Sequence, residues 1–282
     1  DPNKPFCRAD GICVVCADDE HCGMAAPYCR NGICRECLRD ANCAAGEVCT
    51  RGQCSSPTYD FVWSRPDPAP VQFYPDSMAF DAQGNLYVGD GVNRRVLRFD
   101  PNGALLTLWG SQGNGAGQFE NPKGIAVGPD GLIYVLDNEN DRVQRFRPNG
   151  RYVDEWTGEG NGRFDSPESI AVGPNGTVYL VDSGFSDDRI KRYSATGNYL
   201  GQWGERGAGN GQFNGARGIA TAPNGRVYVV DKDNERVQYF NEGGDYRGQW
   251  SLGDGGSPFN APSGIAVGQD GSVFVTDLAN DD

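Results

Sequence analysis

The chain has 282 residues, is 38% hydrophobic and carries a formal net charge of −13 at pH 7. Nucleic-acid backbones require clustered Lys and Arg, which this acidic chain lacks. Its sequence also has no apolar run near the roughly 20 residues of a membrane-spanning helix. Composition therefore predicts neither a nucleic-acid partner nor membrane insertion, and the length allows one large domain with a smaller one attached.

Residues 1–56 are predicted to form a separate domain, because they hold every cysteine of the chain. Two tandem units follow the patterns C-x5-C-x6-C-x4-C and C-x5-C-x5-C-x4-C. So short a segment buries too little apolar surface to fold alone, and an even number of regularly spaced cysteines is typical of a disulfide framework. The cysteines are Cys7, Cys13, Cys16, Cys22, Cys29, Cys34, Cys37, Cys43, Cys49 and Cys54.

Two interpretations of these cysteines stay open. The C-x2-C pairs that begin at Cys13 and Cys34 fit a zinc ribbon, but that pattern crosses the repeat boundaries and uses only four cysteines. The disulfide interpretation uses all of them and predicts an oxidising compartment, either extracellular or periplasmic. First-to-third and second-to-fourth pairing within each unit would give Cys16–Cys29, Cys22–Cys34, Cys37–Cys49 and Cys43–Cys54, with Cys7–Cys13 remaining.

Residues 57–282 repeat one pattern five times. PKGIAVGPDGLIYVLD, which begins at Pro122, returns from Pro167, Ala216 and Pro262, and in a more diverged form from Pro75. The turn glycines of successive copies lie 47, 45, 49 and 46 residues apart. This period is the size of a four-stranded propeller blade.

Each copy contains short runs rich in β-branched and aromatic residues, separated by turn formers. In the second copy the predicted strands a, b, c and d are GIAV (124–127), LIYVLD (132–137), RVQRF (142–146) and RYVDEW (151–156). The predicted fold class is all-β: a β-propeller of four-stranded blades with a small disulfide-rich N-terminal domain.

Five repeats are visible, and a complete ring would have five or six blades. The sequence provides five a, five b and four c strands, and five d strands if YDFVW (59–63) is the first. It ends just before the next c strand, so the last blade is predicted to be incomplete. Either the natural chain continues past Asp282 or another segment supplies the strand.

GQFENPKGIAVGPDGLIYVLDNENDRVQRFRPNG resembles an NHL repeat, from its G-Q-F-x-x-P-x-G-I-A-V opening to its D-x-x-N-x-R-V-Q-x-F close. The resemblance covers about four fifths of the chain and implies a propeller, often of six blades. For the peptidyl-amidating lyases among NHL-like enzymes it implies histidine ligands to zinc. The repeats contain neither His nor Cys, so they offer no such ligands, no Ser-His-Asp triad and no Cys nucleophile.

Two repeated features could carry a ligand. GSQGNGAGQF resembles a phosphate loop, but a strand follows it instead of a helix, so a structural turn is predicted. The links between strands b and c are rich in oxygen ligands, which would suit Ca²⁺ as a cofactor. The alternative is that an Asp–Arg pair and an Asx turn hold each link, with Arg95, Arg142, Arg189 and Arg236 as the arginines. The candidate metal ligands are Asp137, Glu139, Asp141, Asp231, Asp233 and Glu235.

The third copy departs from the repeat, because seven positions instead of five separate Asp182 from Arg189. The insertion adds an aromatic residue, Phe185, to a polar link. Because b–c and d–a links share one face of a propeller, the predicted binding residues on that face are Phe185, Asp187, Asp188 and Arg65. Either Phe185 is a recognition anchor or it packs against a neighbouring blade.

The predicted function is a secreted or cell-surface binding scaffold that recognises protein or glycan through this loop face, without covalent chemistry. One alternative is a structural subunit of an extracellular assembly or filament, joined by strand addition at the incomplete blade or through the head. The other is a metal-dependent hydrolase or lyase that uses the axial channel.

Overall fold

The computed structural model describes residues 74–158, 160–184, 188–253 and 257–279, and the backbone of four short strands near the N-terminus. These four strands are β1 (Tyr28–Arg30), β2 (Ile33–Arg35), β3 (Val48–Thr50) and β4 (Gln53–Ser55). They form two antiparallel hairpins, in which Cys29 lies opposite Cys34 and Cys49 lies opposite Cys54. The last C-x4-C segment of each tandem unit therefore forms the same hairpin. The predicted cysteine pairings and the zinc alternative concern side chains outside the described residues.

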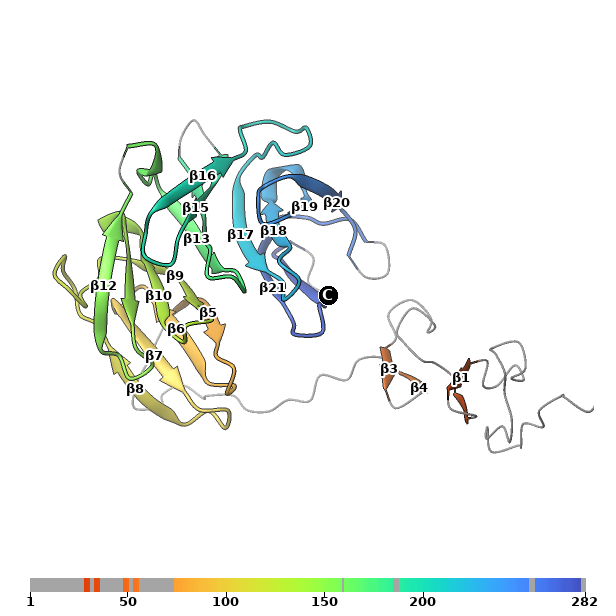
Figure 1. The fold of residues 1–282 in the computed structure, drawn as a ribbon, viewed down its shortest axis with the longest axis horizontal. Helices are drawn as coiled ribbons and strands as arrows, with labels where there is room; N and C mark the ends of the chain where they lie inside the picture. The colour runs from red at the N-terminus through yellow and green to blue at the C-terminus, as the bar shows by residue number, and fades with distance from the viewer. Residues whose placement is uncertain are drawn as a thin grey trace, which may run out of the picture. The chain divides into compact units, whose positions relative to one another are not determined.

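The chain divides into two compact units, and strands β5–β22 belong to the second. They form four antiparallel sheets of four strands in sequential order, followed by one sheet of two strands (Figure 1). Blade 1 contains β5 (Pro75–Phe80), β6 (Leu86–Asp90), β7 (Arg95–Phe99) and β8 (Leu105–Trp109). Blade 2 contains β9 (Pro122–Val127), β10 (Ile133–Asp137), β11 (Arg142–Phe146) and β12 (Tyr152–Thr157).

Blade 3 contains β13 (Pro167–Val172), β14 (Val178–Ser183), β15 (Asp188–Tyr193) and β16 (Tyr199–Trp203). Blade 4 contains β17 (Ala216–Thr221), β18 (Val227–Asp231), β19 (Arg236–Phe240) and β20 (Tyr246–Trp250). The two-stranded sheet contains β21 (Pro262–Val267) and β22 (Val273–Asp277). Short 3₁₀ turns occur at η3 (Asn138–Asn140), η4 (Gly160–Gly162) and η5 (Lys232–Asn234). In the described part no helix is long and apolar enough to cross a membrane.

The strand count agrees with the sequence: five a strands, five b strands and four c strands are described. The all-β propeller of four-stranded blades is thus confirmed. Four d strands are described, and the proposed additional one at 59–63 lies outside the described residues. The a strands of neighbouring blades lie side by side, so β5, β9, β13, β17 and β21 are the innermost strands.

Glycine turns set the register of each a–b hairpin. Gly131 has a φ of 74°, a left-handed conformation that glycine adopts without strain. Its N–H donates to the carbonyl of Gly128 at 2.9 Å, and the N–H of Gly128 donates to the carbonyl of Leu132 at 2.9 Å. The turn glycine recurs with a φ of 80–89° in the other copies, at Gly84, Gly176, Gly225 and Gly271. This is why a glycine recurs at this turn position in all five copies.

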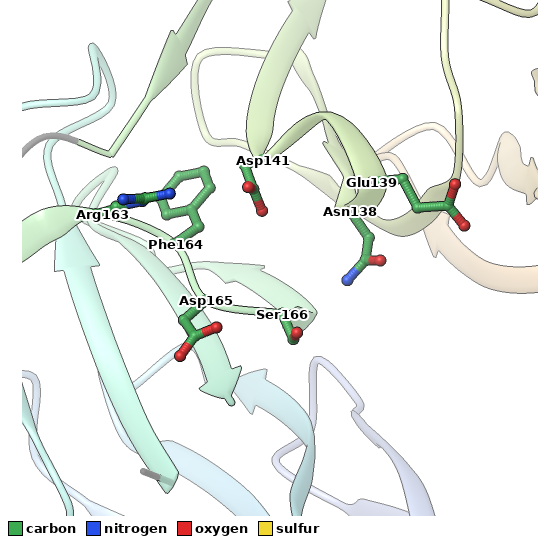
Figure 2. Close-up of a pocket in the computed structure, with 7 residues that line it drawn as sticks. All are labelled: Asn138, Glu139, Asp141, Arg163, Phe164, Asp165 and Ser166. Carbon is green, nitrogen blue, oxygen red and sulfur yellow. The ribbon is translucent and has the colours of Figure 1, made fainter. Parts of the chain in front are cut away.

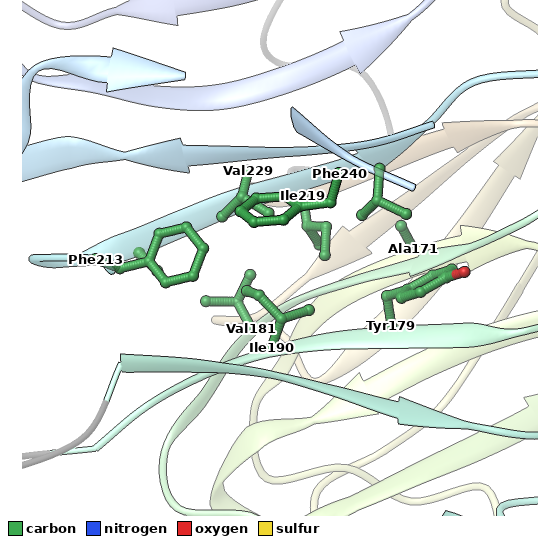
Figure 3. Packing of buried hydrophobic residues seen from close by; sticks show 10 residues of the cluster. Ala171, Tyr179, Val181, Ile190, Phe213, Ile219, Val229 and Phe240 are labelled. Carbon is green, nitrogen blue, oxygen red and sulfur yellow. The ribbon is translucent and has the colours of Figure 1, made fainter. Parts of the chain in front are cut away.

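The apolar core lies between the blades. Between blades 3 and 4, Tyr179, Val181 and Ile190 pack against side chains of the next blade (Figure 3). Their partners there include Ile219 and Val229, and all five side chains are at most 5% exposed. Because a strand's side chains alternate between its two faces, blades 2, 3 and 4 each bury one face against the preceding blade and the other against the following sheet.

Candidate loop-face site

The d–a links and the b–c links meet at one face of the propeller, which we call the loop face. Asp137 ends strand β10, and its Oδ1 accepts hydrogen bonds from the backbone N–H groups of Glu120 and Asn121, both at 3.0 Å. The same bond joins the N–H of Asp165 to Asp182 at 2.7 Å in the third blade. The structure thus confirms that the two kinds of link share a face.

An Asp–Arg pair with a buried aspartate holds the b–c link in three of the blades. In blade 2, Nε of Arg142 donates to Oδ2 of Asp137 at 3.1 Å, and Asn140 donates to the same oxygen at 2.8 Å. Asp137 is fully buried. The corresponding Arg–Asp distances are 2.9 Å for Arg95–Asp90 and 2.7 Å for Arg236–Asp231. The predicted structural role of these residues is confirmed in these blades.

The arginine also holds the glycine-rich link that precedes its blade. The two Nη atoms of Arg142 donate to the carbonyls of Asn114 at 2.7 Å, Gly115 at 3.1 Å and Gln118 at 2.7 Å. Nε2 of Gln144 donates to the same Gln118 carbonyl at 2.7 Å. These links are therefore structural turns, as the sequence predicted.

The candidate metal ligands do not converge. Asp137 and Asp231 are fully buried in the pairs above. The side chains of Glu139, Asp141, Asp233 and Glu235 are exposed. Within the described ranges no group of three or more His, Cys, Asp or Glu residues could hold a metal ion.

Blade 3 holds its link differently. The buried partner of Asp182 is Lys191, whose Nζ lies 2.5 Å from Oδ2 and also donates to the carbonyl of Arg163. Lys191 stands where blades 2 and 4 have Gln144 and Gln238. The sequence prediction that Arg189 would fill this role is corrected, because Lys191 forms the short buried contact with Asp182.

In blade 3, Lys191 takes the place of the arginine, and the d–a link that it contacts is shorter than the link before blade 2. Eleven positions separate Trp156 from Pro167, whereas thirteen separate Trp109 from Pro122. Tyr193 also reaches this link, where its hydroxyl donates to the carbonyl of Gly162 at 2.5 Å. Burial raises the pKa of Asp182 against the opposing effect of Lys191, and burial raises the pKa of Tyr193.

A polar hollow of about 800 Å³ opens on the loop face where this short link meets blade 2. It is lined by Asn138, Glu139, Asp141, Arg163, Phe164, Asp165 and Ser166. Figure 2 shows Asn138 and Asp141 on one side and the residues of the short link on the other. The three carboxylates outnumber the one arginine, so the hollow has a formal charge of −2. Sequence reasoning missed the lining residues Arg163–Ser166. The signal that could have indicated them is the shortened d–a link to which they belong.

The predicted binding residues of the third copy have different outcomes. Asp188 is only 6% exposed, and its Oδ2 accepts a hydrogen bond from the N–H of Gly215 at 3.1 Å. Its carboxylate therefore stabilises the neighbouring link instead of lying on the surface. Phe185, Asp187 and Arg65 lie outside the described residues.

The NHL repeat family matches residues 119–146 and 213–240. The match covers one segment of blades 1–2 and one of blades 3–4, about a fifth of the chain. Each runs from the buried phenylalanine of a d–a link to the end of strand c, and so contains the Asp–Arg pair that holds the loops. The structure is accordingly a β-propeller, two segments of which match the NHL repeat. No curated protein matches the chain in sequence.

Several solved structures share this fold. A chain of a nidogen/laminin complex aligns with a TM-score of 0.59 at 16% identity, over 83% of this chain and 82% of that one. A gluconolactonase from Xanthomonas campestris aligns with a TM-score of 0.54 at 17% identity, over 73% and 70%. A virginiamycin B lyase from Staphylococcus aureus, with quinupristin, gives 0.53 at 15%, over 83% and 71%. At these identities the likeness shows the fold alone.

Proposed function

We propose that this β-propeller is a secreted or cell-surface binding scaffold, which takes a protein partner on its loop face at the junction of blades 2 and 3. The observation that carries the proposal is the hollow of about 800 Å³ at the junction where the loop pattern departs from the repeat. Binding sites on repeat scaffolds occur where loops vary over a constant framework.

The charges around the hollow support recognition of a protein. Asp141 and Asp165 are exposed, and no ion pair within the described residues involves them. By contrast, the buried Asp137 and Asp182 are bonded within the fold. Exposed carboxylates that the fold does not use can steer and orient a partner with a basic surface. The acidic hollow would then determine which partner binds.

The test uses the purified chain and one double variant that combines the isosteric substitutions Asp141→Asn and Asp165→Asn. Asp141 has a φ of 48°, which asparagine tolerates as well as aspartate does, so the first substitution keeps the backbone. Glu242→Gln is the matched control, because Glu242 is exposed on the c–d turn at the other end of the strands.

Immobilised wild type and variants are incubated with extracellular material from the source organism, and bound proteins are quantified by mass spectrometry. We expect at least one protein whose recovery falls about tenfold in the double variant and stays constant in the control. A tenfold fall in affinity corresponds to a loss of about 1.4 kcal/mol in binding free energy. Equal recovery of every bound protein by all three forms would refute the proposal.

A further inference from the structure

The innermost strands place a ring of side chains at the loop-face end of the propeller axis. Strands β9, β13, β17 and β21 each follow a d–a link, and β5 lies beside β9, so the second residue of each a strand lies near this end. These second residues are Asp76, Lys123, Glu168, Arg217 and Ser263. They alternate in charge from blade 1 to blade 4, and the positions therefore form a charged rim around the axis.

A second hollow, of about 250 Å³, lies beside this rim across blades 2, 3 and 4. Its charged lining consists of Lys123, Glu168, Arg217, Lys232 and Asp233. Three cations and two carboxylates give it a formal charge of +1, whereas the whole chain carries −13. A local excess of positive charge in an acidic protein attracts an anionic group to that place.

Two of the three cations are paired. Nζ of Lys123 lies 2.7 Å from Oε1 of Glu168, and Nζ of Lys232 lies 3.5 Å from Oδ1 of Asp233. Arg217 is exposed and forms no ion pair with a carboxylate in the part of the chain that the structure describes. Its guanidinium is thus the cation of this hollow that remains available to a ligand.

The backbone beside Arg217 is held rigidly. The N–H of Gly215 donates to Asp188 at 3.1 Å, and its carbonyl accepts from the N–H of Lys232 at 3.3 Å. The hydroxyl of Ser183 donates to the carbonyl of Ala216 at 2.7 Å. These bonds fix the start of strand β17, so binding an anion at Arg217 would order only the side chain.

We propose that Arg217 anchors a carboxylate, namely an aspartate or glutamate side chain that the protein partner inserts at the mouth of the axis. A guanidinium donates two parallel hydrogen bonds to a carboxylate, a geometry that a lysine ammonium cannot provide. Lys123 and Lys232 add attraction at longer range. This inference rests on the proposed function and names the chemistry of the partner at the centre of the loop face.

The experiment follows the arginine Nε–H signals of the full chain by NMR while a peptide is added. The probe is acetyl-glycyl-aspartyl-glycine amide, and its control is the same peptide with asparagine. The variants are Arg217→Ala and Arg217→Lys. Arg247→Ala is the matched control, because Arg247 is an exposed arginine of strand β20 in the same blade.

We expect a saturable shift of the Arg217 signal with the aspartyl peptide, and none with the asparaginyl peptide. Affinity should fall about tenfold or more in Arg217→Ala, as expected when a charge-assisted hydrogen bond is lost, and fall also in Arg217→Lys. It should stay unchanged in Arg247→Ala. Absence of a saturable shift, an equal response to both peptides or tighter binding of inorganic phosphate would each overturn the assignment.

The two proposals can fail separately. If the peptide does not bind at Arg217 but the carboxylate variants of the larger hollow still lose their protein, the anchor is wrong and the scaffold proposal stands. If the peptide binds but no recovered protein depends on Asp141 and Asp165, the partner site at the junction of blades 2 and 3 is wrong.

Discussion

Removing the cation from the Asp182–Lys191 pair should destabilise the propeller strongly. Both side chains are at most 6% exposed, and the two charged atoms lie 2.5 Å apart. Lys191→Met keeps an unbranched side chain one atom shorter but leaves a buried carboxylate without its counter-ion. Breaking a buried pair from one side costs about 3–5 kcal/mol, because the remaining charge has lost its hydration and its partner. We expect a loss of about that size in the free energy of unfolding at pH 7.

The double variant Asp182→Asn/Lys191→Met is the control for this reasoning. Asparagine keeps an oxygen that can accept the N–H of Asp165, which donates to Asp182 at 2.7 Å. Because the double variant buries no charge, its stability should lie within about 1–2 kcal/mol of the wild type. A double variant as unstable as the single one would show that shape, not charge, determines the loss.

The loss should also depend on pH with a defined sign. Burial raises the pKa of Asp182 above the usual aspartate value of 3.8, and removing Lys191 removes the group that opposes this rise. A carboxyl with a raised folded pKa favours folding most below its unfolded pKa, and that contribution is lost as pH rises through the folded value. The deficit of Lys191→Met should therefore shrink as the pH is lowered from 7 toward 4. Urea unfolding followed by tryptophan fluorescence measures it, and a deficit below about 1 kcal/mol, or one independent of pH, would refute the argument.

Two further predictions concern the repeat itself. Gly197→Ala should lower the melting temperature more than Gly131→Ala, because both glycines have a positive φ but only the first would place its Cβ 2.2 Å from the ring of Trp156. Equal losses in calorimetry would contradict this. Burial raises the pKa of Tyr87, Tyr134 and Tyr179 to about 12, so stability should fall as pH rises from 10 to 12. Absorbance at 295 nm should show that the buried tyrosines, these three and Tyr193 among them, ionise after the exposed ones, and a single step near pH 10 would contradict the prediction.

The scaffold was predictable because its signals are local. A turn with positive φ, such as the one at Gly131, favours glycine. The two members of the Asp137–Arg142 pair are five positions apart in one hairpin, so their pairing can be predicted from sequence spacing. The turn and the pair both recur along repeats of 45–49 residues, so they predicted the blades, their order and the structural role of the pairs. The family resemblance and the periodicity led to the same fold.

The site was less predictable because its contacts join different blades. From the sequence, Asp188 is predicted to be an exposed loop residue. In the structure it is the first residue of β15, and its carboxylate accepts a hydrogen bond from Gly215 in the link before blade 4. The role of Lys191 follows from a link two positions shorter and nearly 30 residues earlier, which no pattern within blade 3 reveals. Arg217 looks like an ordinary variable position until the five innermost strands are placed around one axis.

Site-specific photocrosslinking tests the central claim most directly. The photoreactive amino acid benzoylphenylalanine replaces either Arg163, which is exposed at the hollow, or Arg151, which is exposed before strand β12 at the other end of the blade. Each form is irradiated in extracellular material from the source organism, and adducts are identified by mass spectrometry. The account predicts a discrete protein adduct from position 163 and none of the same mass from position 151. The same adduct from both positions, or an adduct from position 151 alone, would contradict binding at the junction of blades 2 and 3.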